Sequence, residues 1–277
     1  MTRDFSFNST VRLNSGQDLP LLGLGTYLND DCKPACLAAL KKGYKHIDTA
    51  RMYGNESQVG EALRESGVPR EEIYITTKIN NNEHSYEVAS SSVDDSLKTL
   101  GLKYLDCMLI HSPLSNKPSR LDTWRALVDS KKQGKVKAIG VSNYNVKHLE
   151  EIREAGLELP SINQIELHPR CQQKDIVAWC KKYNVVVEAY APLMRGEWNY
   201  PEITETAKKY NKNPAQLLLR WSLQSGYAPL AKSADPKRVV SNAIVFDFDI
   251  SAEDMALIDG LDRGQEGAIT WNPINVD

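Results

Sequence analysis

The chain has 277 residues, of which 41% are hydrophobic and 25% charged, and this composition is typical of soluble domains. The formal net charge of −2 gives no overall field that would attract nucleic acid or an anionic membrane, so neither is expected as a partner. No apolar run approaches the roughly 20 residues that span a bilayer. The first residues also lack the apolar segment of a signal peptide. We therefore expect a cytoplasmic protein.

The five cysteines are an odd number and contain no Cys-x-x-Cys pair. Free thiols in a reducing cytosol are the expected state of Cys32, Cys36, Cys107, Cys171 and Cys180. Cys32 and Cys36 are one helical turn apart and could form half of a metal site. No pair of histidines is nearby in the sequence to complete it, so no metal is expected.

The predicted elements begin with a strand, a turn at Asn14-Ser15-Gly16 and a second strand that runs to Gly25. Apolar periodicity and Gly or Pro punctuation then predict helices at about 34–42, from 56, and at 88–100, 120–133, 146–155, 173–183, 201–210, 214–223 and 252–261. The predicted strands lie at 46–47, 73–78, 105–110, 136–141, 162–166, 185–189 and 227–230. The tail from 264 to 277 is predicted to be loop-like.

Strands and helices alternate about eight times with short connections. This order predicts an α/β protein with a (β/α)8 TIM barrel, preceded by an N-terminal β-hairpin, as a single domain over residues 1–277. A doubly wound sheet is the alternative architecture. The Gly23-Leu24-Gly25 turn lacks the third glycine and the strand-to-helix context of a dinucleotide fingerprint, which disfavours that alternative.

Polar residues follow successive predicted strands, and in a barrel such positions converge on one mouth. Taken singly, each of them is an ordinary rim or loop residue. The set is more informative, because it combines a carboxylate, a phenol, an amine and an imidazole. It consists of Asp48 with Tyr53 just after it, Lys78, His111, Ser142, Asn143, Gln164, Tyr190, Lys232 and Ser233.

The four earliest of these residues form one chemical device. A tyrosine such as Tyr53 can give a proton to a developing alkoxide, and a nearby ammonium such as Lys78 is expected to lower its pKa. Asp48 would hold Lys78 charged, and a neutral His111 would donate a hydrogen bond that aims a carbonyl oxygen. These four residues can polarise a C=O group and protonate its oxygen, but they contain neither a nucleophile nor a metal. Reduction would therefore need a hydride from elsewhere, which implies a nicotinamide cofactor.

At this point the chain resembles the aldo-keto reductase family, and the resemblance covers nearly the whole sequence in order and spacing. The compact length and the tail resemble microbial, especially fungal, members. The motifs that carry the resemblance are Gly43-Tyr-Lys-His-Ile-Asp-Thr-Ala-x-x-Tyr53-Gly-Asn-Glu56, Ile75-Thr-Thr-Lys78, Leu105-Asp-x-x-Leu-Ile-His111, Gly140-Val-Ser-Asn143-Tyr, Asn163-Gln-Ile-Glu166, Glu188-Ala-Tyr-Ala-Pro-Leu193 and Lys232-Ser-x-x-x-x-Arg238-x-x-x-Asn242.

The resemblance implies a role for each matching residue. Tyr53 would be the general acid in reduction, Lys78 and Asp48 would tune it, and His111 would orient the carbonyl. The cofactor-binding residues would be Gly25, Thr26, Ser142, Asn143, Gln164, Tyr190, Leu193, Lys232, Ser233, Arg238 and Asn242. Among these, Ser142, Asn143 and Gln164 would hold the nicotinamide carboxamide, and Tyr190 would stack on its ring.

The resemblance also implies which cofactor is preferred. Lys232, Ser233 and Arg238 correspond to the residues that bind the 2′-phosphate of NADPH in the family. Two cations and a hydroxyl around a dianion make charge-assisted hydrogen bonds, which NADH would lose. NADPH/NADP+ is therefore the expected cofactor. The alternative for this cluster is a solvated basic turn.

Departures from the family pattern bear on the substrate, which is expected to be a small carbonyl compound. Asn80 and Ser112 stand where the family often has tryptophan, so the pocket is expected to be wider and more polar. Tyr27 and Trp271 are the other predicted substrate-binding residues. Trp271 lies in the tail, which either folds over the mouth of the barrel as a substrate-side wall or is free and disordered. Arg195, in the loop after Tyr190, is predicted to reach a cofactor phosphate.

Two further departures are Ser241, in place of an acidic residue that often contacts adenine, and Ala231, in place of a proline.

Besides a monomeric carbonyl reductase, two other functions are considered. One is a cofactor-binding sensor or regulatory barrel with little turnover, similar to the potassium-channel β subunits of the family. The intact catalytic set and the lack of an N-terminal extension disfavour it. The other is a barrel hydrolase or isomerase, disfavoured because paired catalytic carboxylates and a histidine-rich metal cluster are missing.

Overall fold

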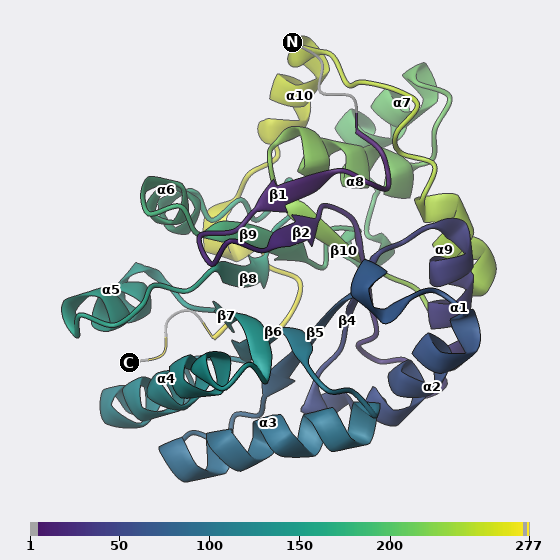
Figure 1. Cartoon of the computed structure of the whole chain (residues 1–277). Helices are drawn as coiled ribbons and strands as arrows, with labels where there is room; N and C mark the ends of the chain where they lie inside the picture. Colours follow the sequence, from purple (N-terminus) through teal and green to yellow (C-terminus); the bar gives the residue numbers. More distant parts are fainter. Residues whose placement is uncertain (1–4, 274–275, 277) are drawn as a thin grey trace.

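The computed structural model describes residues 5–273 and residue 276. Eight parallel strands form a closed barrel in the order β10-β3-β4-β5-β6-β7-β8-β9, and helices surround it (Figure 1). A separate two-stranded antiparallel sheet, β1-β2, precedes the barrel. The predicted (β/α)8 barrel with an N-terminal hairpin is confirmed.

The hairpin consists of β1 (Thr10–Arg12) and β2 (Asp18–Pro20). The barrel strands are β3 (Gly23–Gly25), β4 (His46–Asp48), β5 (Tyr74–Ile79), β6 (Leu105–Ile110), β7 (Val136–Ser142), β8 (Ile162–Glu166), β9 (Val186–Tyr190) and β10 (Ala228–Lys232). The helices are α1 (Lys33–Lys42), α2 (Glu56–Ser66), α3 (Tyr86–Leu100), α4 (Lys117–Lys132), α5 (Val146–Glu154), α6 (Lys174–Lys182), α7 (Pro201–Lys209), α8 (Pro214–Gln224), α9 (Pro236–Asn242) and α10 (Ala252–Asp259).

Two elements differ from the prediction. The predicted second hairpin strand is divided: β2 ends at Pro20, and β3 is the first strand of the barrel. Gly23 permits this, because a Cβ there would lie 2.6 Å from Leu230 Cδ2 and 2.8 Å from His46 Nδ1. Helix α9 was not predicted, since seven residues carry little periodicity; its available signal was the Asp235 N-cap followed by Pro236.

The hairpin covers the amino-terminal end of the barrel, and it crosses the front of the view in Figure 1. Leu13 and Leu19 are buried in a cluster with residues near the strand starts, including Tyr74 and Ala228. Asn14 ties the turn to the segment before β8, donating to Pro160 O at 3.0 Å and accepting from Ser161 Oγ at 2.7 Å. With this end closed, the carboxyl ends of the strands are where a site can form.

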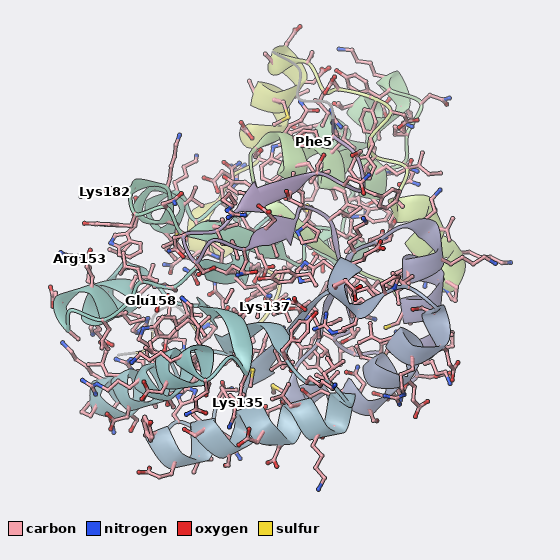
Figure 2. The ribbon with its side chains drawn as sticks, in the orientation of Figure 1. Phe5, Lys135, Lys137, Arg153, Glu158 and Lys182 are labelled. Carbon is pink, nitrogen blue, oxygen red and sulfur yellow. The ribbon has the colours of Figure 1, made fainter. Side chains whose placement is uncertain are left out.

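The helices pack on the barrel through one large apolar cluster that includes Trp124 of α4 and Trp221 of α8, both buried. Figure 2 shows the side chains in this view, with Phe5 beside α8, where the guanidinium of Arg220 lies 4.9 Å from its ring centroid. Within the described residues, no helix is both long and apolar enough to cross a membrane.

Candidate active site

A buried ion pair lies at the carboxyl end of neighbouring strands. Asp48 is the last residue of β4 and Lys78 the penultimate residue of β5. Lys78 Nζ donates to Asp48 Oδ1 at 2.6 Å and to Thr49 O at 2.8 Å. Burial disfavours the charge on Lys78, but Asp48 and Tyr53 outweigh this effect and raise the lysine pKa. Lys78 therefore stays protonated inside the barrel.

Tyr53 is carried by a short 3-10 turn, Arg51–Tyr53, directly after β4. Asn55 fixes the following residues, because its side chain donates to Thr26 O at 3.0 Å and accepts from Thr49 Oγ1 at 2.8 Å. Arg51 holds the other side of the turn through a pair with Glu83, with Nη2 3.0 Å from Oε1. The loop that presents the phenol is thus anchored on two sides.

The Tyr53 ring lies among the other predicted groups. Lys78 Nζ is 5.2 Å from its centroid, and the His111 ring packs edge-on at 5.6 Å. Burial raises the pKa of Tyr53 to about 12, while the charge of Lys78 acts in the lowering direction. Lys78 thus lowers the pKa of Tyr53 as expected, but the net pKa is raised, because desolvation exceeds the effect of the ammonium.

His111, just after β6, is neutral at physiological pH. Burial lowers its pKa to about 3, and the charge of Lys78 adds to the shift. Its Nδ1 atom is buried and has no hydrogen-bond partner among the described residues. A neutral imidazole beside the phenol can donate one hydrogen bond to an oxygen without competing for the proton.

Gln164 of β8 joins this group through its amide nitrogen, which donates to Asp48 Oδ2 at 2.8 Å and to Glu188 Oε2 at 2.9 Å. Glu188 of β9 is fully buried, and burial raises its pKa to about 8, with the Asp48 charge contributing. Glu188 was not predicted as a site residue. The available signal was an acidic residue two positions before Tyr190 in a strand whose other residues are apolar.

Ser142, Asn143 and Tyr190 form a second hydrogen-bonded group. Asn143 Nδ2 donates to His111 O at 3.0 Å and to Ser142 Oγ at 3.1 Å, and its Oδ1 accepts from the Tyr190 hydroxyl at 2.7 Å. Ser142 Oγ itself donates to Gln164 O at 2.9 Å. These three residues thus lie next to the group around Asp48, as expected from their positions at strand ends.

Gly25 connects these groups with the basic cluster, since in the sheet register it pairs with Asp48 on one side and Lys232 on the other. Thr26 follows it, fully buried, and its backbone N–H donates to Asp48 O at 3.0 Å. Gly25, the last residue of β3, therefore lies between the buried carboxyl group of Asp48 and the exposed Lys232.

Lys232 ends β10, and Ser233 and Arg238 lie just after it. Arg238 Nε donates to Ser233 Oγ at 3.4 Å. Partial burial lowers the pKa of Lys232, and the neighbouring charge of Arg238 lowers it further. Arg238 is 3.7 Å from Asp235, whereas Lys232 has no ion pair within the described chain. Asn242, at the end of α9, is buried.

Leu193 and Arg195 lie in the loop after β9. Leu193 is half-buried, and its carbonyl accepts from Trp198 Nε1 at 2.6 Å. Arg195 is exposed and has a left-handed backbone with φ of 51°. No hydrogen bond connects it to the other predicted residues among those described, so its place in the site stays a prediction.

The predicted substrate-binding residues differ in their exposure and in their contacts. Tyr27 is 44% exposed, and its ring centroid is 5.0 Å from that of Tyr53. Ser112 is fully buried and donates to Asn81 Oδ1 at 2.6 Å. Asn80 is half-buried; its backbone donates to Glu83 at 2.8 Å, and its Oδ1 has no partner within the described chain.

The carboxyl-terminal segment reaches the same end of the barrel. Glu166, the last residue of β8, accepts from the backbone N–H of Ile269 at 2.7 Å and of Thr270 at 3.3 Å. Trp271 is 57% exposed, and its carbonyl oxygen lies 3.5 Å from the Tyr190 hydroxyl oxygen. The carbonyl of Trp271 therefore lies beside Tyr190, and the substrate-side role of this residue stays a prediction.

The side chains present at the site determine which chemistry it can perform. Over residues 5–273 and 276, no cluster of three or more His, Cys, Asp or Glu side chains could hold a metal ion, and all five cysteines are buried free thiols. The polar groups instead comprise a phenol, a protonated amine and a neutral imidazole around one place. This arrangement can polarise and protonate a carbonyl oxygen.

Comparisons with known proteins identify the family of the chain. Residues 22–263 match the model of the aldo/keto reductase family. A glyoxal reductase of Bacillus subtilis is 43% identical, with 94% of this chain and 95% of that protein covered. An aldo-keto reductase from a deep-sea metagenome of the Medee basin superposes with a TM-score of 0.92 at 41% identity, covering 97% of this chain and all of the other. A Bombyx mori aldo-keto reductase solved in complex with NADP has a TM-score of 0.86 at 34% identity, with 92% of each chain covered. The chain belongs to the aldo-keto reductase family.

Proposed function

We propose that the protein is an NADPH-dependent reductase that converts aldehydes and ketones to alcohols. The observation that carries the proposal is the buried, protonated Lys78, held by Asp48 at 2.6 Å, beneath the phenol ring of Tyr53. A binding protein has no need to bury an ion pair under a tyrosine, because that burial costs free energy.

In this proposal Tyr53 gives its proton to the carbonyl oxygen as charge develops there. The pKa of about 12 describes a phenol that is fully protonated at neutral pH and so ready to act as the acid. Lys78 stabilises the phenolate that remains, and neutral His111 donates a hydrogen bond to the substrate oxygen. A bound reduced nicotinamide supplies the hydride.

The residues present fit such a cofactor. Lys232 and Arg238 are like charges held close enough for Arg238 to lower the pKa of Lys232, and a phosphate between them would relieve that repulsion. We assign the 2′-phosphate to these two side chains and Ser233. Ser142, Asn143 and Gln164 would hold the carboxamide, Tyr190 the ring, and Gly25, Thr26, Leu193, Arg195 and Asn242 the remainder of the cofactor.

The substrate class follows from the mouth. Tyr27 and Trp271 give exposed aromatic surface, while Asn80 provides a polar edge. Because one relative is named a glyoxal reductase, small dicarbonyl compounds belong among the substrates that we propose. A monomer in the cytoplasm is part of the same proposal, since a reducing compartment preserves the five free thiols.

The experiment is a turnover assay that follows the absorbance of NADPH with a panel of aldehydes, ketones and dicarbonyl compounds. We expect oxidation of NADPH with several of them and weaker activity with NADH. Binding of NADPH without turnover of any substrate would refute the reductase and favour a regulatory barrel. Absence of NADPH binding would refute the cofactor as well.

A further inference from the structure

Gln164 is held between two carboxyl groups. Its Nε2 donates to Asp48 Oδ2 at 2.8 Å on one side and to Glu188 Oε2 at 2.9 Å on the other. All three side chains are buried, with 3% exposure or less. An amide nitrogen has two N–H donors, so both are used inside the barrel.

This arrangement fixes which end of the amide faces the mouth. If the Gln164 amide were rotated by 180°, its carbonyl oxygen would face Asp48 Oδ2, an acceptor already paired with Lys78 through the other oxygen, and the buried hydrogen bond to Asp48 would be lost. In the observed orientation Nε2 is the atom that faces both carboxyl groups, and Oε1 is the remaining polar atom of the side chain. It accepts no hydrogen bond from the described part of the chain, so it is available to a ligand.

Both carboxyl groups are needed for this effect. Asp48 alone would satisfy one N–H of Gln164 and leave the side chain able to turn about that single bond. Glu188 supplies the second bond and has no other hydrogen-bond partner among the described residues. Its Oε1 is unpartnered and lies 3.8 Å from His46 Nε2. The polar contacts of Glu188 are thus directed at Gln164 rather than at a wider structural network.

We propose that Glu188 is a positioning residue that locks the Gln164 amide, so that its carbonyl accepts a hydrogen bond from the carboxamide N–H of the nicotinamide. The inference rests on the proposed function, in which Gln164 contacts that carboxamide. It adds a chemical consequence: the site selects a cofactor whose ring substituent carries an N–H donor. A substituent with a carbonyl but no N–H would meet an acceptor that it cannot satisfy.

The test compares two cofactors that differ at this substituent. NADPH carries a carboxamide, whereas its 3-acetylpyridine analogue carries a methyl ketone without N–H. Dissociation constants are measured by protein fluorescence or calorimetry for the wild-type protein and two variants. Glu188→Gln keeps an acceptor for Gln164, and Glu188→Met has similar length but no acceptor.

We expect the wild-type protein and Glu188→Gln to bind NADPH about tenfold more tightly than the analogue, as one lost hydrogen bond implies. Glu188→Met should lose most of this preference, chiefly through weaker binding of NADPH. If Glu188→Met does not fold, as judged by circular dichroism, Glu188→Asp replaces it, because the shorter side chain withdraws the carboxyl group from Gln164.

Three results separate the possible failures. A preference that is unchanged in Glu188→Met, or in Glu188→Asp where that variant replaces it, overturns the positioning role of Glu188. Equal binding of the two cofactors by the wild-type protein overturns the acceptor at Gln164, while the reductase itself stands. No binding of NADPH to the wild-type protein overturns the proposed function instead.

Discussion

Replacing Glu188 by glutamine is expected to change how the stability of the protein depends on pH. The folded protein raises the pKa of Glu188 from 4.5 to about 8, first through burial and then through the Asp48 charge. A carboxyl whose pKa is raised on folding stabilises the fold fully below its unfolded pKa. That contribution is lost as pH rises through the folded pKa. The affected window therefore runs from about pH 4.5 to about pH 8.

The magnitude follows from this window. Each pKa unit corresponds to about 1.4 kcal/mol, so the free energy of unfolding of the wild-type protein should fall by on the order of 4 kcal/mol, relative to Glu188→Gln, between pH 5 and pH 8. This value is an upper bound, because neighbouring groups relax when the carboxyl ionises. Glutamine has the shape of the protonated acid and does not titrate. Urea unfolding at several pH values measures the difference directly.

Glu166→Gln is the matched control, since it makes the same substitution in the neighbouring strand. Its effect on the pH dependence of stability should have the opposite sign. Burial opposes ionisation of Glu166, but hydrogen bonds from His168, Ile269 and Thr270 prevail and lower its pKa. Its contribution is present above the unfolded pKa of 4.5 and lost as pH falls through the folded value. Parallel pH profiles for wild type and Glu188→Gln would refute the assignment of a neutral buried acid.

Two other predictions concern the cofactor and the fold. Replacing Lys232 and Arg238 by alanine should raise the dissociation constant for NADPH by roughly 10- to 100-fold per charge-assisted bond, with little change for NADH; equal effects in a binding titration would count against the phosphate site. Gly23→Ala should destabilise the barrel by about 1–3 kcal/mol, because a Cβ would lie within 2.8 Å of Leu230 and His46. An unchanged urea midpoint would show that this packing is looser.

Much of the barrel could be predicted from the sequence, because its strands are short apolar runs bounded by glycine or proline. The predicted bounds of β6 and β8 agree with the structure. Short elements were harder. The three residues of β3 contain two glycines and carry no strand pattern of their own. They form a strand because the barrel must close between β10 and β4.

Some features of the candidate site could likewise be predicted from the sequence, and others could not. Asp48 and Lys78 could be predicted to meet, because residues at the carboxyl ends of adjacent parallel strands share one edge. The pKa of Tyr53 could not be predicted in sign, since it depends on how far burial exceeds the effect of Lys78. The bridge from Gln164 to Glu188 also required coordinates, because strand spacing does not reveal which end of an amide faces a carboxyl group.

The central claim is that Tyr53 protonates the substrate oxygen. Tyr53→Phe removes only the hydroxyl, so the protein should fold and bind NADPH with an unchanged dissociation constant. The rate of reduction of the best aldehyde should fall by at least about 10²- to 10⁴-fold, as expected for loss of a general acid. The decisive measurement is single-turnover reduction at saturating NADPH. A Tyr53→Phe variant that reduces the aldehyde at the wild-type rate would contradict the account, and so would one that no longer binds NADPH.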